Sequence, residues 1–324
     1  MDKLTTKRVV TVTLNPALDL TGSLDTIKLG SVSLVKQSDL HAAGKGVNVA
    51  KVLSDLGAEV TVTGFLGKDN PELFHQLFEQ IDATNEFVEV DGATRINVKL
   101  VESNGEVTDI NFPGVQVNQT AITEFEATLN RLAQSHDYFV FAGSLPQGVS
   151  PQQYANWIAH LRQLGKKVLF DSSKEALRVG IEAKPWLIKP NDEELGDLLG
   201  QTLSTPEQCQ QAAQQLGQSG IENIVVSMGA EGVMWFNQGE WLRAQPPRMN
   251  VVSTVGAGDT LVAGLCWGHM QNLQKNELLR LATALSALAV SQVGVGVSSQ
   301  QELERLTLET QVIQLEPAKN DNGN

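Results

Sequence analysis

The clearest structural signal in the chain is the stretch Thr254-Val255-Gly256-Ala257-Gly258-Asp259-Thr260. This glycine-rich turn leads directly into a predicted helix with apolar residues at Leu261, Val262 and Leu265. The first N–H groups of such a helix have no intrahelical partner, and together with the helix dipole they attract phosphate oxygens. Asp259 is then either a capping residue of the first turn or a general base beside a transferring phosphoryl group.

Three further turns lie where a predicted strand ends: Ala43-Gly44-Lys45-Gly46-Val47-Asn48, Asn191-Asp192-Glu193-Glu194 and Ser227-Met228-Gly229-Ala230-Glu231-Gly232. The first is either a turn with an exposed lysine or a cradle for a sugar phosphate, with Asn48 in the first helical turn. In the second, Asn191 and Glu194 form either a capping box or a pair of oxygens that orders Mg²⁺ and its waters. The third is either a hairpin turn or a ligand-binding bend at the carboxyl end of a strand.

Short apolar strands alternate with amphipathic helices through most of the chain, which predicts an α/β fold with a mostly parallel sheet covered by helices on both faces. The expected strands are Val9–Leu14, Glu59–Phe65, Tyr138–Ala142, Lys167–Phe170, Trp186–Ile188 and Ile224–Ser227. The expected helices include Gly46–Leu56, Ala121–Ala133, Pro151–Leu164, Asp192–Leu199, Thr205–Leu216, Asp259–His269, Asn276–Val290 and Gln300–Leu306.

Two alternating regions do not fit this sheet and predict a small accessory β-layer: Asp19–His41, and a hairpin of Arg95–Val101 with Val107–Phe112 around Asn104-Gly105. A second hairpin is expected from Val233–Phe236 and Trp241–Arg243. The polar tail 316–324 is expected to be frayed.

The composition narrows the classes of partner. The 324 residues carry 37 acidic and 24 basic side chains, a net charge of −13. This excess of negative charge argues against nucleic acid and against an anionic membrane surface as binding partners. Cys209 and Cys266 stand in no metal-binding or disulfide pattern. The start of the chain lacks the apolar segment of a signal peptide, and no run of 18 apolar residues occurs, so we expect a cytoplasmic protein.

Taken together and in this order, seven features resemble the ribokinase-like (PfkB) sugar kinases over nearly the whole chain: Asp19, Gly44–Asn48, Arg95, Gly143-Ser144-Leu145-Pro146, Asn191–Glu194, the Ser227 turn and Gly256–Asp259. The resemblance implies an ATP-dependent sugar-phosphate kinase that forms one domain, 1–324. Its accessory layer would be a β-lid built from about 19–43 and 93–112, through which two copies form a homodimer.

The resemblance also implies roles for individual residues. Asp259 would be the catalytic base, and the N–H groups of Gly256, Ala257, Gly258 and Asp259 would form an anion hole. The sugar phosphate would be bound by Asp19, Gly44, Lys45, Asn48, Arg95, Lys99 and Ser144. ATP would be bound by Lys189, Asn191, Ser227, Gly229, Ala230, Gly232 and Gly258, with Mg²⁺ held through water by Asn191 and Glu194.

Within the family, Thr13–Asp19, His41–Gly46, Thr94–Lys99 and Val252-Ser253-Thr254 resemble a bacterial subfamily that phosphorylates the C6 hydroxyl of D-fructose 1-phosphate. Tagatose 6-phosphate and fructose 6-phosphate are alternative acceptors, since related kinases share much of this pattern. A non-catalytic sugar-phosphate sensor on the same fold is a further alternative, against which the intact Gly256–Asp259 stretch argues. K⁺ is a candidate ion, although Ser253 or Thr254 stands where the family commonly has an aspartate.

Overall fold

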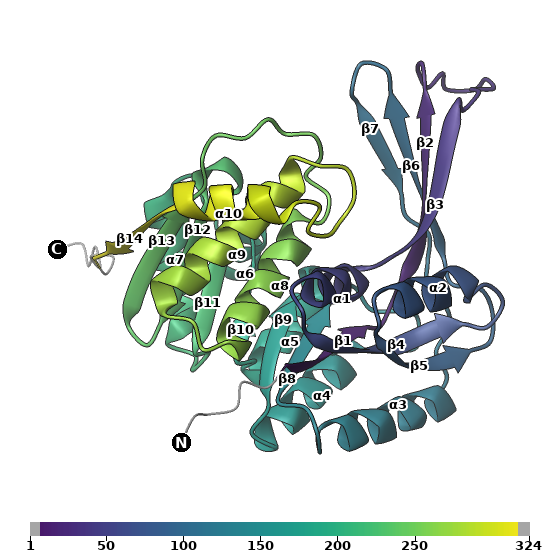
Figure 1. Cartoon of the computed structure of the whole chain (residues 1–324). Helices are drawn as coiled ribbons and strands as arrows, with labels where there is room; N and C mark the ends of the chain where they lie inside the picture. The colour runs from purple at the N-terminus through teal and green to yellow at the C-terminus, as the bar shows by residue number, and fades with distance from the viewer. Residues whose placement is uncertain (1–6, 317–324) are drawn as a thin grey trace.

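The structure is a computed structural model and describes residues 7–316. The tail predicted to fray, 316–324, therefore lies outside the described residues apart from Glu316. Figure 1 shows the chain as a large sheet between helices, with a smaller sheet that projects from it.

The large sheet has ten strands in the order β14-β13-β12-β11-β10-β9-β8-β1-β4-β5. From β11 to β5 every neighbouring pair is parallel, whereas β12, β13 and β14 extend the sheet in antiparallel fashion. The strands are β1 (Arg8–Thr13), β4 (Glu59–Gly67), β5 (Thr84–Val90), β8 (Tyr138–Ala142), β9 (Lys167–Asp171), β10 (Leu187–Ile188), β11 (Asn223–Ser227), β12 (Val233–Asn237), β13 (Glu240–Gln245) and β14 (Gln311–Leu315). The predicted mostly parallel sheet is thus confirmed, and so is the hairpin of β12 and β13. The outer strands β5 and β14 were not predicted.

Helices cover both faces of this sheet because its central strands are apolar on both sides. One face packs against α1 (Lys45–Asp55), α2 (Glu72–Gln80), α8 (Ala257–Met270), α9 (Lys275–Val290) and α10 (Gln300–Glu309). The other face packs against α3 (Gln119–Leu132), α4 (Pro151–Gln163), α5 (Lys174–Gly180), α6 (Asp192–Leu199) and α7 (Pro206–Gly217). None of the helices within residues 7–316 is long and apolar enough to cross a membrane.

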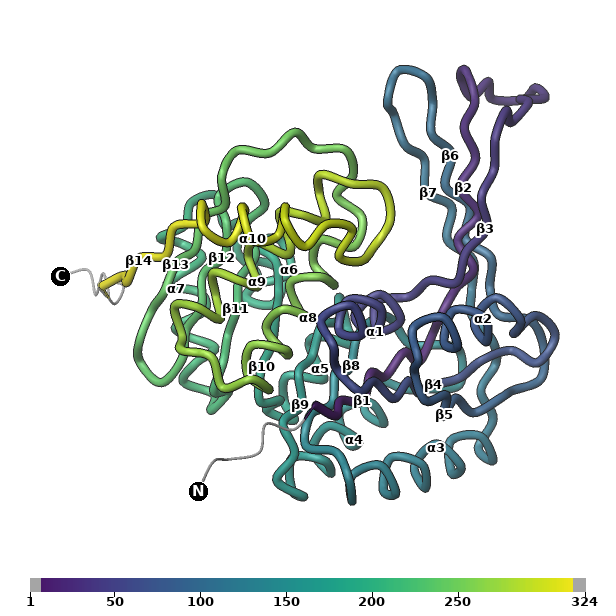
Figure 2. The backbone as a smooth tube through the Cα atoms, in the orientation of Figure 1, coloured from purple at the N-terminus to yellow at the C-terminus, as the bar shows by residue number. Residues whose placement is uncertain are grey.

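A second sheet of four strands has the order β3-β2-β6-β7. It consists of β2 (Ala17–Leu24), β3 (Gln37–Ala43), β6 (Ile96–Glu102) and β7 (Val107–Ile110). Figures 1 and 2 show that it stands away from the large sheet as a projecting layer, which we call the lid. The lid combines the two segments that the sequence analysis left outside the main sheet, and β6 and β7 form the expected hairpin.

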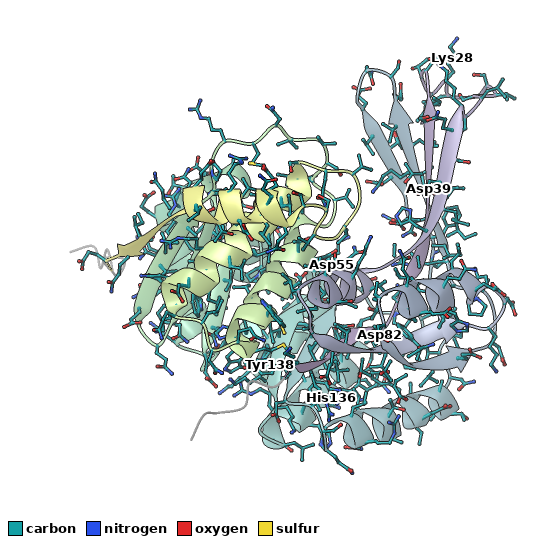
Figure 3. The ribbon with its side chains drawn as sticks, viewed as in Figure 1. Lys28, Asp39, Asp55, Asp82, His136 and Tyr138 are labelled. Carbon is teal, nitrogen blue, oxygen red and sulfur yellow. The ribbon has the colours of Figure 1, made fainter. Side chains whose placement is uncertain are left out.

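The order of the strands determines where a ligand can bind. The chain runs outward from β1 through β4 to β5, and later runs in the other direction from β8 through β9 and β10 to β11. Such a reversal opens a crevice at the carboxyl ends of the strands on either side of the switch, here β1 and β8. Only Leu14–Pro16 separate the carboxyl end of β1 from the lid strand β2, so the lid begins at this edge. His136 and Tyr138, labelled in Figure 3, lie at the opposite, amino end of β8.

Candidate active site

Asp259 lies in the first turn of α8, just after the N-cap residue Gly256. Gly256 has φ 78°, a left-handed conformation that glycine adopts without strain. The N–H of Ala257 donates to the Thr254 carbonyl, and the next two N–H groups, of Gly258 and Asp259, have no acceptor within a regular helix. The first turn of α8 therefore presents donors and a carboxylate together.

The carboxylate of Asp259 is buried, with 6% of the residue exposed. Asn48 Nδ2 donates to Asp259 Oδ2 at 2.7 Å, which links the first turn of α8 to the first turn of α1. Burial raises the pKa of Asp259 from its ordinary 3.8 to about 6, assisted by the nearby charge of Asp171 and opposed by Lys45, Asn48 and Lys189. Near neutral pH this carboxylate is ionised and is a stronger proton acceptor than an exposed one.

Two lysines flank a second buried carboxylate, Asp171, at the carboxyl end of β9. Asp171 is 1% exposed and lies 3.3 Å from Lys45 Nζ through Oδ2 and 3.4 Å from Lys189 Nζ through Oδ1. Only the Lys45 contact has the geometry of a hydrogen bond. Burial favours the neutral acid, but Lys189 and Lys45 hold the pKa of Asp171 below its ordinary value.

The same charges act on Lys45. Burial favours its neutral amine, yet Asp171, Asp259 and Glu194 raise the pKa of Lys45 to about 12. Lys189, 5% exposed, lies against the first turn of α8, because a Cβ placed on Gly258 would be 3.5 Å from Lys189 Nζ. Two ammonium groups are thereby held beside Asp259.

The short connection between β1 and β2, Leu14–Pro16, is hydrogen-bonded to the predicted substrate residues Arg95 and Ser144. Arg95 donates to the carbonyls of Asn15, Pro16 and Phe112 at 2.9, 3.3 and 3.2 Å. Ser144, which is exposed, follows β8 and has its hydroxyl bonded to the side chain of Asn15. The sequence analysis treated Arg95 as a phosphate ligand, and the structure adds that it holds this connection in place.

The lid carries Asp19 and Lys99. Asp19 pairs with Asn97 across β2 and β6, and Asn97 Nδ2 donates to Asp19 Oδ1 at 3.2 Å. Lys99 lies two residues further along β6 and thus on the same face of the lid, where its Nζ is 3.7 Å from Asp109 Oδ1.

The turns after β10 and β11 lie side by side. Asn191 and Glu194 form a complete capping box at the start of α6, with N–H···O distances of 2.7 and 3.0 Å. Asn191 also pairs with Ser227 in an isolated parallel bridge. Beyond Ser227 the residues Gly229–Glu231 form a single 3₁₀ turn, and Gly232 has φ 88°. Asn191 and Glu194 therefore have the capping role that was one of the two predicted alternatives. The predicted ATP-binding residues of these turns lie at the same edge of the sheet as Asp259.

The sequence profile of the pfkB family of carbohydrate kinases matches residues 12–302 of the chain. The chain belongs to the pfkB family. A 1-phosphofructokinase of Vibrio cholerae is 68% identical over 312 residues, 96% of this chain and 98% of that protein. A 1-phosphofructokinase of Escherichia coli is 50% identical over 299 residues, 92% of this chain and 95% of that protein. The solved structure of phosphofructokinase-2 from Escherichia coli in complex with potassium superposes with a TM-score of 0.86 at 26% identity, covering 93% of this chain and 98% of that chain. The ribokinase-like fold and the kinase class inferred from the sequence are thus confirmed.

Asp171 is a candidate residue of this pfkB kinase that the sequence analysis missed. A signal was available, because Asp171 directly follows the buried run Val168–Phe170 at the carboxyl end of a parallel strand. Its contact with Lys45 joins segments 126 residues apart in the chain and could not be read from local spacing.

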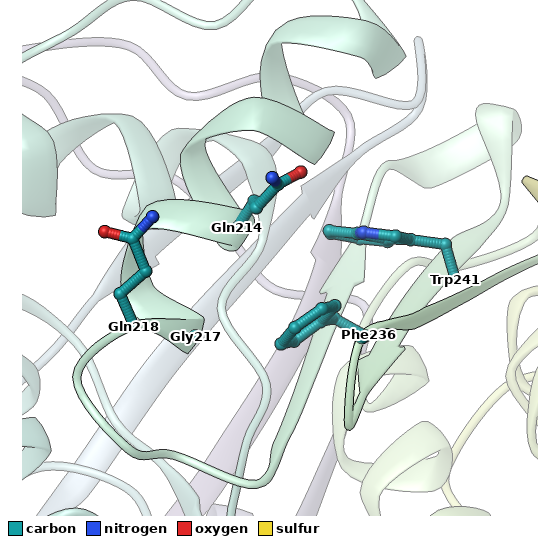
Figure 4. Close-up of a pocket in the computed structure, with 6 residues that line it drawn as sticks. Gln214, Gly217, Gln218, Phe236 and Trp241 are labelled. Atoms are coloured by element: carbon teal, nitrogen blue, oxygen red, sulfur yellow. The ribbon is translucent and has the colours of Figure 1, made fainter. Parts of the chain in front are cut away.

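A pocket of about 240 Å³ lies elsewhere in the kinase, beside the β12–β13 hairpin. Figure 4 shows Phe236 and Trp241 on one side of it and Gln214 and Gln218 of the α7 region on the other. It lies toward the amino end of β11 and includes none of the predicted site residues. Within residues 7–316 no group of three His, Cys, Asp or Glu side chains is arranged to hold a metal ion.

Proposed function

We propose that the chain transfers the γ-phosphoryl group of ATP to the C6 hydroxyl of D-fructose 1-phosphate and releases fructose 1,6-bisphosphate and ADP. The observation that carries the chemistry is the buried Asp259 carboxylate, with its pKa raised to about 6, beside the free N–H groups of α8. The choice of acceptor is supported by the relatives in Vibrio cholerae and Escherichia coli that are named 1-phosphofructokinase.

In the proposed reaction, Asp259 takes the proton of the C6 hydroxyl while the oxygen forms a bond to the γ-phosphorus of ATP. The bond from that phosphorus to the bridging oxygen of ADP breaks at the same time, and its electron pair leaves with ADP. Gly256, Ala257, Gly258 and Asp259 would supply backbone donors for the negative charge on the transferring group, the Ala257 N–H by exchanging its long 3.4 Å bond to the Thr254 carbonyl. Lys189, next to Gly258, adds a positive charge on the same side.

The acceptor would bind between α1, the turn after β8 and the lid. Lys45 and Ser144 suit the existing phosphate of the sugar, the first as a point charge and the second as a hydrogen-bond donor. The Arg95 guanidinium has five N–H donors, and its three bonds to carbonyls leave donors for a phosphate oxygen. Asp19 and Asn48 would bind hydroxyl groups, Gly44 would allow close approach, and Lys99 would close over the phosphate from the lid.

ATP would lie along the turns that follow β10 and β11, against Lys189, Asn191, Ser227, Gly229, Ala230, Gly232 and Gly258. The residues fit a Mg²⁺ ion held mainly by phosphates and water, since such a site needs one or two protein oxygens. Glu194 is close enough to raise the pKa of Lys45, and its Oε2 is the oxygen engaged in the capping box. Bound Mg²⁺ would neutralise charge on the ATP phosphates, and Asn191 and Glu194 would orient its water ligands.

The oligomer and a monovalent ion also belong to the proposal. The lid exposes Leu40, Ile96, Val107 and Ile110, so we propose that two copies of the single domain cover each other's lids as a homodimer. We also propose a K⁺ ion near the turn before α8, held by carbonyl and hydroxyl oxygens, since Ser253 or Thr254 stands where the family commonly has an aspartate. The hydroxyl of Ser253 already accepts the Val255 N–H at 3.2 Å.

Initial rates with Mg-ATP test the substrate directly. We expect kcat/KM for fructose 1-phosphate to exceed that for fructose 6-phosphate and for tagatose 6-phosphate by at least about 100-fold, because donors placed for a phosphate at C1 would be left unpaired by the other two sugars. A preference for one of the other two sugars would refute the assignment of fructose 1-phosphate as the acceptor but would leave the assignment as a sugar-phosphate kinase intact. Binding of the sugar phosphates without ADP release would favour a sensor instead.

A further inference from the structure

Asn15 occupies the connection between β1 and β2, and only 8% of it is exposed. Its amide nitrogen donates to Ser144 Oγ at 3.0 Å and to the Leu145 carbonyl at 3.2 Å. Both hydrogens of the amide are therefore directed at the turn that follows β8. The side chain links this turn to the base of the lid across 129 residues of sequence.

The orientation of this amide follows from its partners. The Leu145 carbonyl can only accept a hydrogen bond, so it must face the nitrogen and not the oxygen of Asn15. Asn15 Oδ1 is buried without a hydrogen-bond partner among the described residues. It rests against Gly114, where a Cβ would lie 1.9 Å from Oδ1. The surroundings thus admit one orientation, and they hold it by close packing.

A consequence follows for the hydroxyl of Ser144. Ser144 Oγ accepts the hydrogen from Asn15, so the single hydrogen of the hydroxyl must point in another direction. Ser144 is exposed, and its neighbour Gly143 lies beside Lys45, since a Cβ on Gly143 would be 3.8 Å from Lys45 Cβ. The hydroxyl hydrogen is therefore available to a ligand, and the residue next to Ser144 lies against the Lys45 side chain.

The main chain of the same connection binds the third predicted phosphate ligand. Arg95 Nη2 donates to the Asn15 carbonyl at 2.9 Å, and Arg95 Nε donates to the Pro16 carbonyl at 3.3 Å. Asn15 thus contacts Ser144 through its side chain and Arg95 through its backbone. A shift of this connection would move both groups together.

We propose that Asn15 is a positioning residue for the phosphate of the acceptor. By donating to Ser144 Oγ it holds the Ser144 hydroxyl as a donor toward a phosphate oxygen beside Lys45. The inference rests on the proposed function, because it deepens the recognition of a phosphorylated sugar at that site. Asn15 does not touch the reacting atoms, so its removal affects binding of the acceptor and leaves the chemical step and the ATP site unchanged.

A double-mutant cycle tests this coupling. The variants are Asn15→Leu, Ser144→Ala and the two combined, with Asn156→Ala on the exposed face of α4 as a matched control. We expect Asn15→Leu and Ser144→Ala each to raise KM for fructose 1-phosphate about tenfold, the typical effect of one hydrogen bond to a charged group. KM for ATP and kcat stay within about twofold, and the double variant matches Ser144→Ala alone because Asn15 acts through Ser144.

Three results would overturn the inference: effects that multiply in the double variant, an equal rise of KM for ATP, or an unchanged KM for fructose 1-phosphate in Asn15→Leu. If Asn15→Leu does not fold, Asn15→Ala enters the same cycle with the same expectation. If the wild-type protein prefers another ketohexose phosphate, the proposed substrate is wrong, and the cycle is measured with the preferred one.

Discussion

Replacing Asp259 with asparagine should slow turnover strongly and stabilise the fold at neutral pH. The asparagine keeps the shape of the side chain and an oxygen that can accept the Asn48 hydrogen bond now measured at 2.7 Å. It removes a carboxylate that is 6% exposed and whose pKa burial raises from 3.8 to about 6. The wild-type protein therefore ionises a buried acid at neutral pH, and the variant does not.

The free energy follows from the linkage of protonation to folding. The folded state binds this proton more tightly than the unfolded state, so the contribution of Asp259 to stability declines as pH rises from about 4 to about 6 and is constant above. The difference between 3.8 and about 6 corresponds to about 3 kcal/mol at pH 7. The loss of the general base should lower kcat by about 10²- to 10⁴-fold.

Urea unfolding of both proteins at several pH values between 4 and 8 measures this difference. We expect the two free energies of unfolding to be equal near pH 4 and the variant to be more stable at pH 7. The kcat/KM of the wild type should decrease as the pH is lowered through the Asp259 pKa of about 6. A variant that is less stable at pH 7, or a stability difference that does not change with pH, would refute the reasoning.

Two further substitutions test the surroundings of Asp259. Gly256→Ala should lower kcat at least about tenfold, because the new methyl group would lie 2.4 Å from Val295 Cγ2 and the residue has φ 78°. Gly239→Ala is the matched control and should keep full kcat, because Gly239 has φ 86° but a methyl group there would meet no atom within 4 Å. Asp171→Asn should lower the free energy of unfolding by about 3 kcal/mol in urea titrations, because it leaves two lysines without their buried counterion. Unchanged stability would contradict the pairing.

The main sheet was predictable where strands are buried on both faces. The runs Val9–Leu14 and Tyr138–Ala142 are almost continuously apolar, and their strands are central. The strands β5 and β14 were missed for a physical reason, because they are the two outer strands of the sheet. An outer strand lacks one neighbour, and in these two strands only Val88 and Val90 are buried, so neither segment forms a continuous apolar run.

The candidate site was predictable where one short turn contains both the glycines that shape the backbone and the polar side chain that acts in the site. Gly256–Asp259 and Gly44–Asn48 are such turns, and the structure joins them through the Asn48–Asp259 hydrogen bond. Asp171 and Asn15 could not be predicted in this way. Each matters through a contact with a segment more than 100 residues away, Lys45 for Asp171 and Ser144 for Asn15.

The most direct test of the central claim is the identity of the product. The wild-type protein and Asp259→Asn are each incubated with Mg-ATP and fructose 1-phosphate, and the sugar is examined by ³¹P NMR. We predict that the wild type forms a second phosphate ester at C6, and that the variant binds both substrates but forms the product at least about 100 times more slowly. A phosphate ester at another position, or an undiminished rate in Asp259→Asn, would contradict the account.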